Sequence, residues 1–111
     1  MNRKYGYIRV SSVDQNIERQ KNAMRKVGIR DDYLFIDKQS GKDFSRPAYQ
    51  KLVKQCQESD VIFIDSIDRL GRNYQEILEE WRILTKEKKV DIVVLDMPIL
   101  DTRSNLTPED L

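Results

Sequence analysis

Two short runs of branched apolar residues constrain the fold of this chain more than any other feature. Val61–Asp65 and Val90–Leu95 contain apolar stretches without the polar alternation of a half-exposed strand. Such strands are buried on both faces, as in parallel sheets covered by helices. A chain of 111 residues is long enough for one hydrophobic core. We therefore expect a single three-layer α/β domain, with a mostly parallel sheet and helices on both of its faces.

The other segments alternate between strands and helices. The runs Lys4–Val10 and Tyr33–Asp37 are predicted strands. Apolar residues at helical spacing predict three helices, and their capping residues agree: Asp14–Val27 before Gly28, a second helix from Pro47, and Tyr74–Lys86 after the N-cap pair Asn73 and Glu76.

The last residues of the sequence predict the start of another helix. Thr107 is a capping residue, Pro108 suits a first helical turn, and Glu109 and Asp110 favour the positive end of a helix dipole. We expect residues 1–100 to form the domain and 101–111 to form a linker and the start of a truncated long helix. The chain would then be a fragment of a longer protein.

Composition excludes several kinds of site. The chain has no histidine, which removes Ser-His-Asp and Cys-His nucleophilic sites and most zinc sites. Its single cysteine, Cys56, cannot form an intramolecular disulfide, and neither a signal peptide nor a membrane-length apolar run is found. We expect a cytoplasmic protein without a membrane partner. Because the net charge is only +1, nucleic-acid affinity would require a local basic cluster.

Cationic side chains follow the predicted strands at their carboxyl ends, where ligands of parallel sheets bind. Arg9 precedes Ser11 by two residues, so both share one side of the first strand and its extension. A guanidinium in a covered strand requires an anionic partner, which is either an internal carboxylate or a ligand. Further groups expected at this end of the sheet are Asp68, Arg69 and Arg72 after Val61–Asp65, with Arg46 overhanging from the loop before Pro47.

A hydroxyl surrounded by guanidinium groups favours phosphoryl transfer, because the planar arginine fork binds phosphate oxygens bidentately. Without histidine, Ser11 would be activated by the cationic field or by a carboxylate such as Asp68. Simpler interpretations stay open for each segment: Ser11 as a turn residue, and both basic segments as solvated loops.

Taken together, these motifs resemble the catalytic domain of the serine recombinases, the resolvase/invertase family. The resemblance runs from about Lys4 to Leu95. It rests on Tyr7-Ile8-Arg9-Val10-Ser11-Ser12 with Gln15 and Gln20, on Ser40-Gly41 with Arg46, and on Asp68-Arg69-Leu70-Gly71-Arg72.

The resemblance implies a definite reaction on double-stranded DNA of a bacterial chromosome, plasmid or mobile element. Ser11 would attack a phosphodiester, forming a 5′-phosphoserine bond and releasing a 3′-hydroxyl. Homodimers would pair into a tetramer that exchanges and religates the strands, with no metal or other cofactor. The implied site comprises Arg9, Arg69 and Arg72 on the phosphate, Arg46 from a loop that can move, Asp68 as an orienting or proton-shuttling group, and Gln15 and Gln20 as positioning groups.

The sequence departs from the family at one position. Family members commonly carry a lysine where Gln55 stands here, and the neighbouring Lys54 would point about 100° away on a helix. Members also continue into a long helix and a helix-turn-helix domain. The alternative function is a catalytically silent, DNA-tethered oligomerisation or regulatory module of the same fold. Receiver domains and cysteine phosphatases fit poorly, since the first strand ends in Arg-Val-Ser-Ser and the residue six after Cys56 is Ile62.

Overall fold

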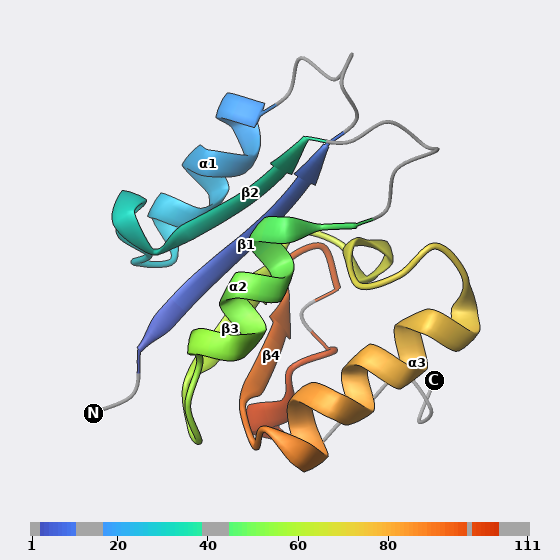
Figure 1. The fold of residues 1–111 in the computed structure, drawn as a ribbon. Coiled ribbons are helices and arrows are strands. Elements are labelled where there is room, and N and C mark those ends of the chain that lie inside the picture. The colour runs from blue at the N-terminus through green and yellow to red at the C-terminus, as the bar shows by residue number, and fades with distance from the viewer. Residues whose placement is uncertain (1–2, 11–16, 39–44, 98, 105–111) are drawn as a thin grey trace.

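The computed structural model describes residues 3–10, 17–38, 45–97 and 99–104. Their strands form a four-stranded parallel sheet in the order β2-β1-β3-β4 (Figure 1). The strands are β1 (Lys4–Val10), β2 (Leu34–Lys38), β3 (Val61–Ile64) and β4 (Asp91–Val94). Helix α1 (Ile17–Lys26) packs on one face, whereas α2 (Pro47–Gln55) and α3 (Tyr74–Arg82) pack on the other. The predicted parallel sheet with helices on both faces is confirmed.

Side chains of β1 alternate between the two faces. Tyr5 and Tyr7 belong to the core beneath α2 and α3, while Ile8 and Val10 belong to the core beneath α1. Gly6 allows α1 and β2 to pack closely, because a Cβ there would lie 2.7 Å from Leu34 Cδ2 and 3.1 Å from Met24 Sδ. The same alternation places Arg9 on the side of the two tyrosines, at the end of the strand.

The two apolar runs that predicted the fold lie where expected. All four residues of β3 are buried, and they divide between the two cores, with Ile62 and Ile64 facing α2 and α3 and Val61 and Phe63 facing α1. Strand β4 divides in the same way, with Ile92 and Val94 opposite Val93. Burial on both faces explains why these strands lack polar alternation.

The helix bounds differ from the predicted ones in two places. The predicted start at Asp14 lies outside the described residues, and α1 begins at Ile17 within them. Helix α3 ends at Arg82 and continues as one π-helical turn over Ile83–Glu87, where an uninterrupted helix to Lys86 was predicted. In this turn Lys88 N donates to the Ile83 carbonyl at 2.9 Å, the five-residue spacing of a π-helix, and the Thr85 hydroxyl donates to the Trp81 carbonyl at 2.7 Å.

The strand bounds are shifted by at most one residue. A 3₁₀ turn over Asp31–Tyr33 delays β2 to Leu34. After β4 the chain returns to the sheet, where Asp101 bridges Val93 and the Thr102 hydroxyl accepts the N–H of Ile92 at 2.8 Å. The predicted helix start at Thr107 lies outside the described residues. Among the helices that the structure describes, none has the length and apolarity needed to span a membrane.

Candidate active site

The segment between β3 and α3, residues 65–73, lies at the carboxyl end of the sheet, where all four parallel strands finish. It contains a 3₁₀ turn over Ile67–Arg69 and is anchored by Leu70, which is fully buried in the core. Gly71 then passes directly against the start of α3, because a Cβ there would lie 2.6 Å from Glu76 Cβ and 2.8 Å from Ile77 N. A side chain at position 71 would push this segment away from α3.

Arg9 reaches from the end of β1 to this segment. Its Nη2 donates a hydrogen bond to the main-chain carbonyl of Asp68 at 2.8 Å. Burial lowers the pKa of the guanidinium, and the charges of Arg69 and Arg46 act in the same direction, against the raising effect of Tyr7. Three of the predicted arginines therefore lie close enough to influence one another, as expected for strand ends meeting at one end of a sheet.

Arg46 lies at the N-cap of α2, and it is buried rather than overhanging. Only 8% of its surface is exposed. Its Nη1 donates to the carbonyls of Leu70 at 2.8 Å and Arg69 at 3.3 Å, and its Cζ lies 4.0 Å from the ring centroid of Tyr49. The backbone at Arg46 is left-handed, with φ 47° and ψ 62°. The position differs from the predicted one because contacts with a segment more than twenty residues away fix the side chain.

Arg69 and Arg72 are each held by a carboxylate of their own segment. Arg69 makes a two-pronged contact with Asp65, at 2.9 Å and 3.3 Å. The more exposed Arg72 places Nη2 3.0 Å from Glu76 Oε2, and its side-chain hydrogen bond is the main cause of the lowered pKa of Glu76. Both guanidinium groups are thus oriented near the surface, where an incoming phosphate would share them with the carboxylates.

The remaining predicted residues occupy different surroundings. Asp68 is exposed, and its Oδ1 accepts a hydrogen bond from the Ser66 hydroxyl. Gln20 lies on α1 with 3% of its surface exposed, and its Oε1 accepts no hydrogen bond from any described residue. It lines a cavity of about 390 Å³ together with Asp65 and Arg69. Ser11 and Gln15 lie outside the described residues.

The structure also separates the two candidates for the family's lysine position. Lys54 and Gln55 are both exposed near the end of α2. Lys54 lines a groove of about 360 Å³ between α2 and α3 that also contains Arg46 and Tyr49, whereas the lining of this groove does not include Gln55. Lys54 therefore lies on the side of α2 that borders this groove, whereas Gln55 does not line it.

Sequence reasoning missed Asp37, which organises the site from beneath. Its carboxylate is 3% exposed and accepts hydrogen bonds from the Tyr7 hydroxyl at 2.8 Å, Ala48 N at 2.9 Å and Tyr49 N at 3.0 Å. It therefore caps α2 from β2, the strand next to β1, where it stands beside Arg9 in register. Burial, followed by the bond to Asp37, raises the pKa of Tyr7 above its ordinary range. The available signal was a charged residue at the end of an otherwise apolar predicted strand.

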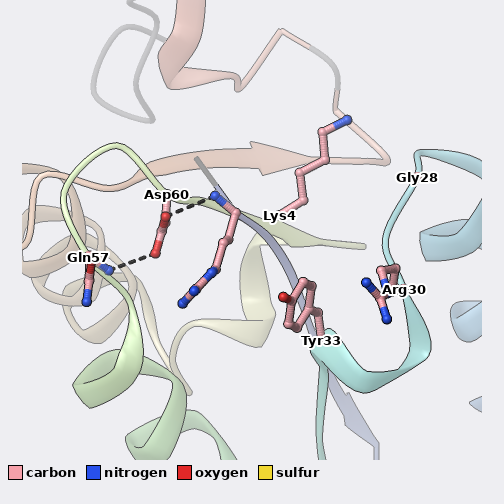
Figure 2. Close-up of a pocket in the computed structure, with 7 residues that line it drawn as sticks. Lys4, Gly28, Arg30, Tyr33, Gln57 and Asp60 are labelled. Carbon is pink, nitrogen blue, oxygen red and sulfur yellow. Dashed lines mark hydrogen bonds between the residues drawn. The ribbon is translucent and has the colours of Figure 1, made fainter. Parts of the chain in front are cut away.

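A second polar cluster lies at the amino end of the sheet, where the strands begin (Figure 2). It surrounds a cavity of about 740 Å³ lined by Arg3, Lys4, Gly28, Arg30, Tyr33, Gln57 and Asp60. Buried Asp60 accepts the N–H groups of Arg3 at 3.0 Å and Gln57 at 2.8 Å. None of the predicted site residues is among these lining residues, so size and positive charge alone do not mark the candidate site.

Comparisons with known proteins identify the family of the chain. The family model described as resolvase, N-terminal domain, matches residues 4–108. Transposon Tn21 resolvase of Escherichia coli is 41% identical over 81 residues, which are 73% of this chain and 41% of that protein. DNA-invertase hin of Salmonella typhimurium is 38% identical over 73 residues, which are 66% of this chain and 37% of that protein.

A solved structure extends the likeness to three dimensions. The N-terminal catalytic domain of TP901-1 integrase superposes with a TM-score of 0.66 at 25% identity, covering 93% of this chain and 84% of that chain. The chain spans about two fifths of the length of the curated relatives it matches. Family model, relatives and fold point the same way, and the chain belongs to the resolvase family through its N-terminal domain.

Proposed function

We propose that this protein is the catalytic domain of a serine site-specific recombinase that breaks and rejoins double-stranded DNA. The observation that carries the proposal is the joining of three segments at the carboxyl end of the sheet. Arg9 donates to the Asp68 carbonyl, and Arg46 donates to the Leu70 carbonyl, so strand β1 and helix α2 both meet the segment that bears Arg69 and Arg72. Preorganised guanidinium groups suit a reaction in which charge develops on phosphate oxygens.

The proposed reaction is a transesterification at phosphorus. The Ser11 oxygen forms a bond to the phosphorus, and the bond from phosphorus to the 3′-oxygen breaks. The Ser11 hydroxyl loses its proton, and the 3′-oxygen gains a proton to become a 3′-hydroxyl. One phosphodiester bond replaces another, so the energy of the DNA backbone is retained in the 5′-phosphoserine and religation is the reverse step. Asp68 orients an arginine or moves a proton in this scheme, and Gln15 and Gln20 position the nucleophile and the phosphate.

The arginines have separate roles. Arg9, Arg69 and Arg72 bind the scissile phosphate, whose charge is spread over its non-bridging oxygens in the transition state. Arg46 joins them from α2 and holds the Arg69–Leu70 main chain through its two carbonyl contacts. Removing one preorganised donor from a site of this kind costs about 2.7–4 kcal/mol of transition-state stabilisation.

We further propose that the natural assembly is a homodimer that pairs into a tetramer on DNA, in the cytoplasm of a bacterium. Support for DNA and for a bacterial setting comes from the names of relatives, which include transposon resolvases and DNA-invertases of several bacteria, whereas the dimer and tetramer are what the resemblance to serine recombinases implies. Each protomer would supply one Ser11, so four strand ends would be held covalently at once. Residues outside the matched part of those relatives would supply the sequence preference of the whole protein.

The test joins this chain to the part of Tn21 resolvase that the match does not cover and incubates the chimaera with nicked DNA carrying that resolvase's site. We expect a covalent protein–DNA adduct on denaturing gels that disappears in Ser11→Ala and persists in the matched control Ser12→Ala. No adduct despite confirmed DNA occupancy would overturn the proposal and favour the silent regulatory module.

A further inference from the structure

The groove between α2 and α3 contains an aromatic ring in direct contact with one of the proposed catalytic arginines. Tyr49 lies on α2 and is buried, and its ring centroid is 4.0 Å from Cζ of Arg46. Its hydroxyl donates to Glu80 Oε1, on α3, at 2.7 Å. The position of Tyr49 on the buried side of α2 does not by itself account for these two contacts.

The Tyr49 ring restrains the Arg46 guanidinium in addition to the hydrogen bonds of its Nη1 atom. Nη1 of Arg46 donates hydrogen bonds to the carbonyls of Leu70 and Arg69. Cζ of the same group lies over the Tyr49 ring, whose negative face attracts a cation. The two carbonyl contacts and the ring contact together restrict the movement of the guanidinium.

Tyr49 is itself held from three sides. Its N–H donates to Asp37 Oδ2 at 3.0 Å, and its ring packs against Tyr7 with centroids 5.0 Å apart. The third contact, with Glu80, joins the ring to α3, the helix that begins directly after the Arg69–Arg72 segment. Burial, followed by the bond to Glu80, raises the pKa of the Tyr49 phenol far above its ordinary value, so the hydroxyl remains a donor.

We propose that Tyr49 is a positioning residue for DNA cleavage: its ring face sets the orientation of the Arg46 guanidinium, and the hydroxyl contact with Glu80 is one of three contacts that support the ring. The inference rests on the proposed function, in which Arg46 acts near the scissile phosphate. The contacts link α2, α3 and the Arg69–Leu70 main chain through one side chain. Tyr49 touches neither DNA nor the nucleophile in this account and acts only through Arg46.

Two substitutions separate positioning from simple filling of the core. Tyr49→Phe keeps the ring and loses only the hydroxyl contact, whereas Tyr49→Leu keeps an apolar side chain and loses the ring face. A matched control is Leu84→Ala. Leu84 is fully buried in the same core, in the π-helical turn after α3, so its substitution removes core volume without removing the ring beside Arg46. All three variants are compared at a temperature where thermal unfolding shows that each is folded.

The first readout is the rate of covalent adduct formation by the Tn21 chimaera at saturating DNA. We expect Tyr49→Leu to slow the rate at least tenfold without weakening DNA occupancy, Tyr49→Phe to slow it less than threefold, and Leu84→Ala to leave it near the parental rate. Equal slowing by Tyr49→Leu and Leu84→Ala would overturn the proposal, as would a Phe variant as slow as the Leu variant.

The second readout does not depend on cleavage. In the 111-residue chain, the Arg46 Nε–H resonance should be shifted upfield by the ring, retained in Tyr49→Phe and moved to an ordinary position in Tyr49→Leu. An unchanged Arg46 resonance in Tyr49→Leu would contradict the positioning role. If the parental chimaera forms no adduct, the proposed function fails, and this resonance still decides whether Tyr49 orients Arg46.

Discussion

The two ends of the sheet both carry arginines beside a buried aspartate, yet only one of them is built as a site. At the carboxyl end, Arg9 and Arg46 are fixed by main-chain carbonyls of a segment distant in sequence. At the amino end, Arg30 is exposed and its carboxylate partner is Asp32, two residues away and 3.3 Å distant. The amino end has the cavity of about 740 Å³, but its cations, which include Lys4 and Arg30, are exposed (Figure 2). The charged group of Lys4 makes a long contact, of 3.4 Å, with the Val27 carbonyl.

The difference shows that anchoring, rather than charge or cavity size, identifies the candidate active site. A guanidinium that is docked before substrate arrives loses little freedom when it binds a phosphate, whereas an exposed one must be ordered first. Contacts with a separate segment provide that docking, because the partner does not move together with the loop that carries the arginine. The two ends can therefore be told apart by substitutions that remove either anchoring or charge.

The largest expected effect is on cleavage, from Arg9→Ala at the carboxyl end. Losing a docked donor should slow adduct formation by about 10²–10³-fold, and DNA occupancy by the chimaera should change little. The amino-end counterpart is Arg3→Ala, from the start of the same strand. Equal loss of cleavage in the two variants, measured by single-turnover gel assays, would remove the distinction between the ends.

The next effect compares the two buried aspartates. Asp37→Ala leaves three donors without an acceptor and should lower the free energy of unfolding by about 2–4 kcal/mol, while Asp60→Ala leaves two and should cost about 1–2 kcal/mol. Urea titration followed by tryptophan fluorescence measures both values. Among molecules that remain folded, only Asp37→Ala should also slow cleavage, and an equally slow Asp60→Ala would show that the defect is general.

A smaller effect should follow from Gly71→Ala. The added methyl would meet Glu76 and Ile77 at less than 3 Å, so the segment must shift, at a cost of about 1–3 kcal/mol. This segment supplies the carbonyls that hold Arg9 and Arg46. The rate of cleavage by the folded protein should therefore also fall, beyond what the loss of stability explains. Gly28→Ala tests the amino end, where the φ of +90° is strained for alanine but no catalytic side chain depends on the turn. If the Gly71→Ala variant cleaves DNA at the parental rate, the carbonyl contacts of Arg9 and Arg46 are not needed for catalysis.

The smallest effect is expected for Arg30→Ala, the exposed cation at the amino end. Surface ion pairs of this kind contribute little, so the free energy of unfolding should change by less than about 0.5 kcal/mol. Cleavage by the chimaera should remain at the parental rate. A loss of cleavage without a loss of stability would assign a functional role to the amino end.

The fold could be predicted because its signals are local. The apolar runs now seen as β3 and β4, the proline at the start of α2 and the Asn73 cap each depend on a few adjacent residues. The π-helical turn over Ile83–Glu87, which contains Thr85 and the buried Leu84, could not be predicted. Nothing in the helical spacing of this segment distinguishes a π turn from a continued α-helix.

The candidate site divides in the same way. Arg9, Arg46, Arg69 and Arg72 were identifiable as residue types after predicted strands, and the first three lie together in the structure. The burial of Arg46 and the capping by Asp37 were missed because both depend on contacts between segments that the sequence does not place. The roles of Ser11 and Gln15 stay predictions, as do those of the other site residues.

The position of β1 in the sheet has a consequence for how the protein is made. β1 leaves the ribosome before the other three strands, yet it lies between β2 and β3 and pairs with both. Its β3 partner is completed about fifty residues later, a delay of roughly 3–10 s at ordinary rates of synthesis. Strand β2 and helices α1 and α2 are made before β3, so these are the elements that can cover the apolar side chains of β1 until Ile64 has emerged.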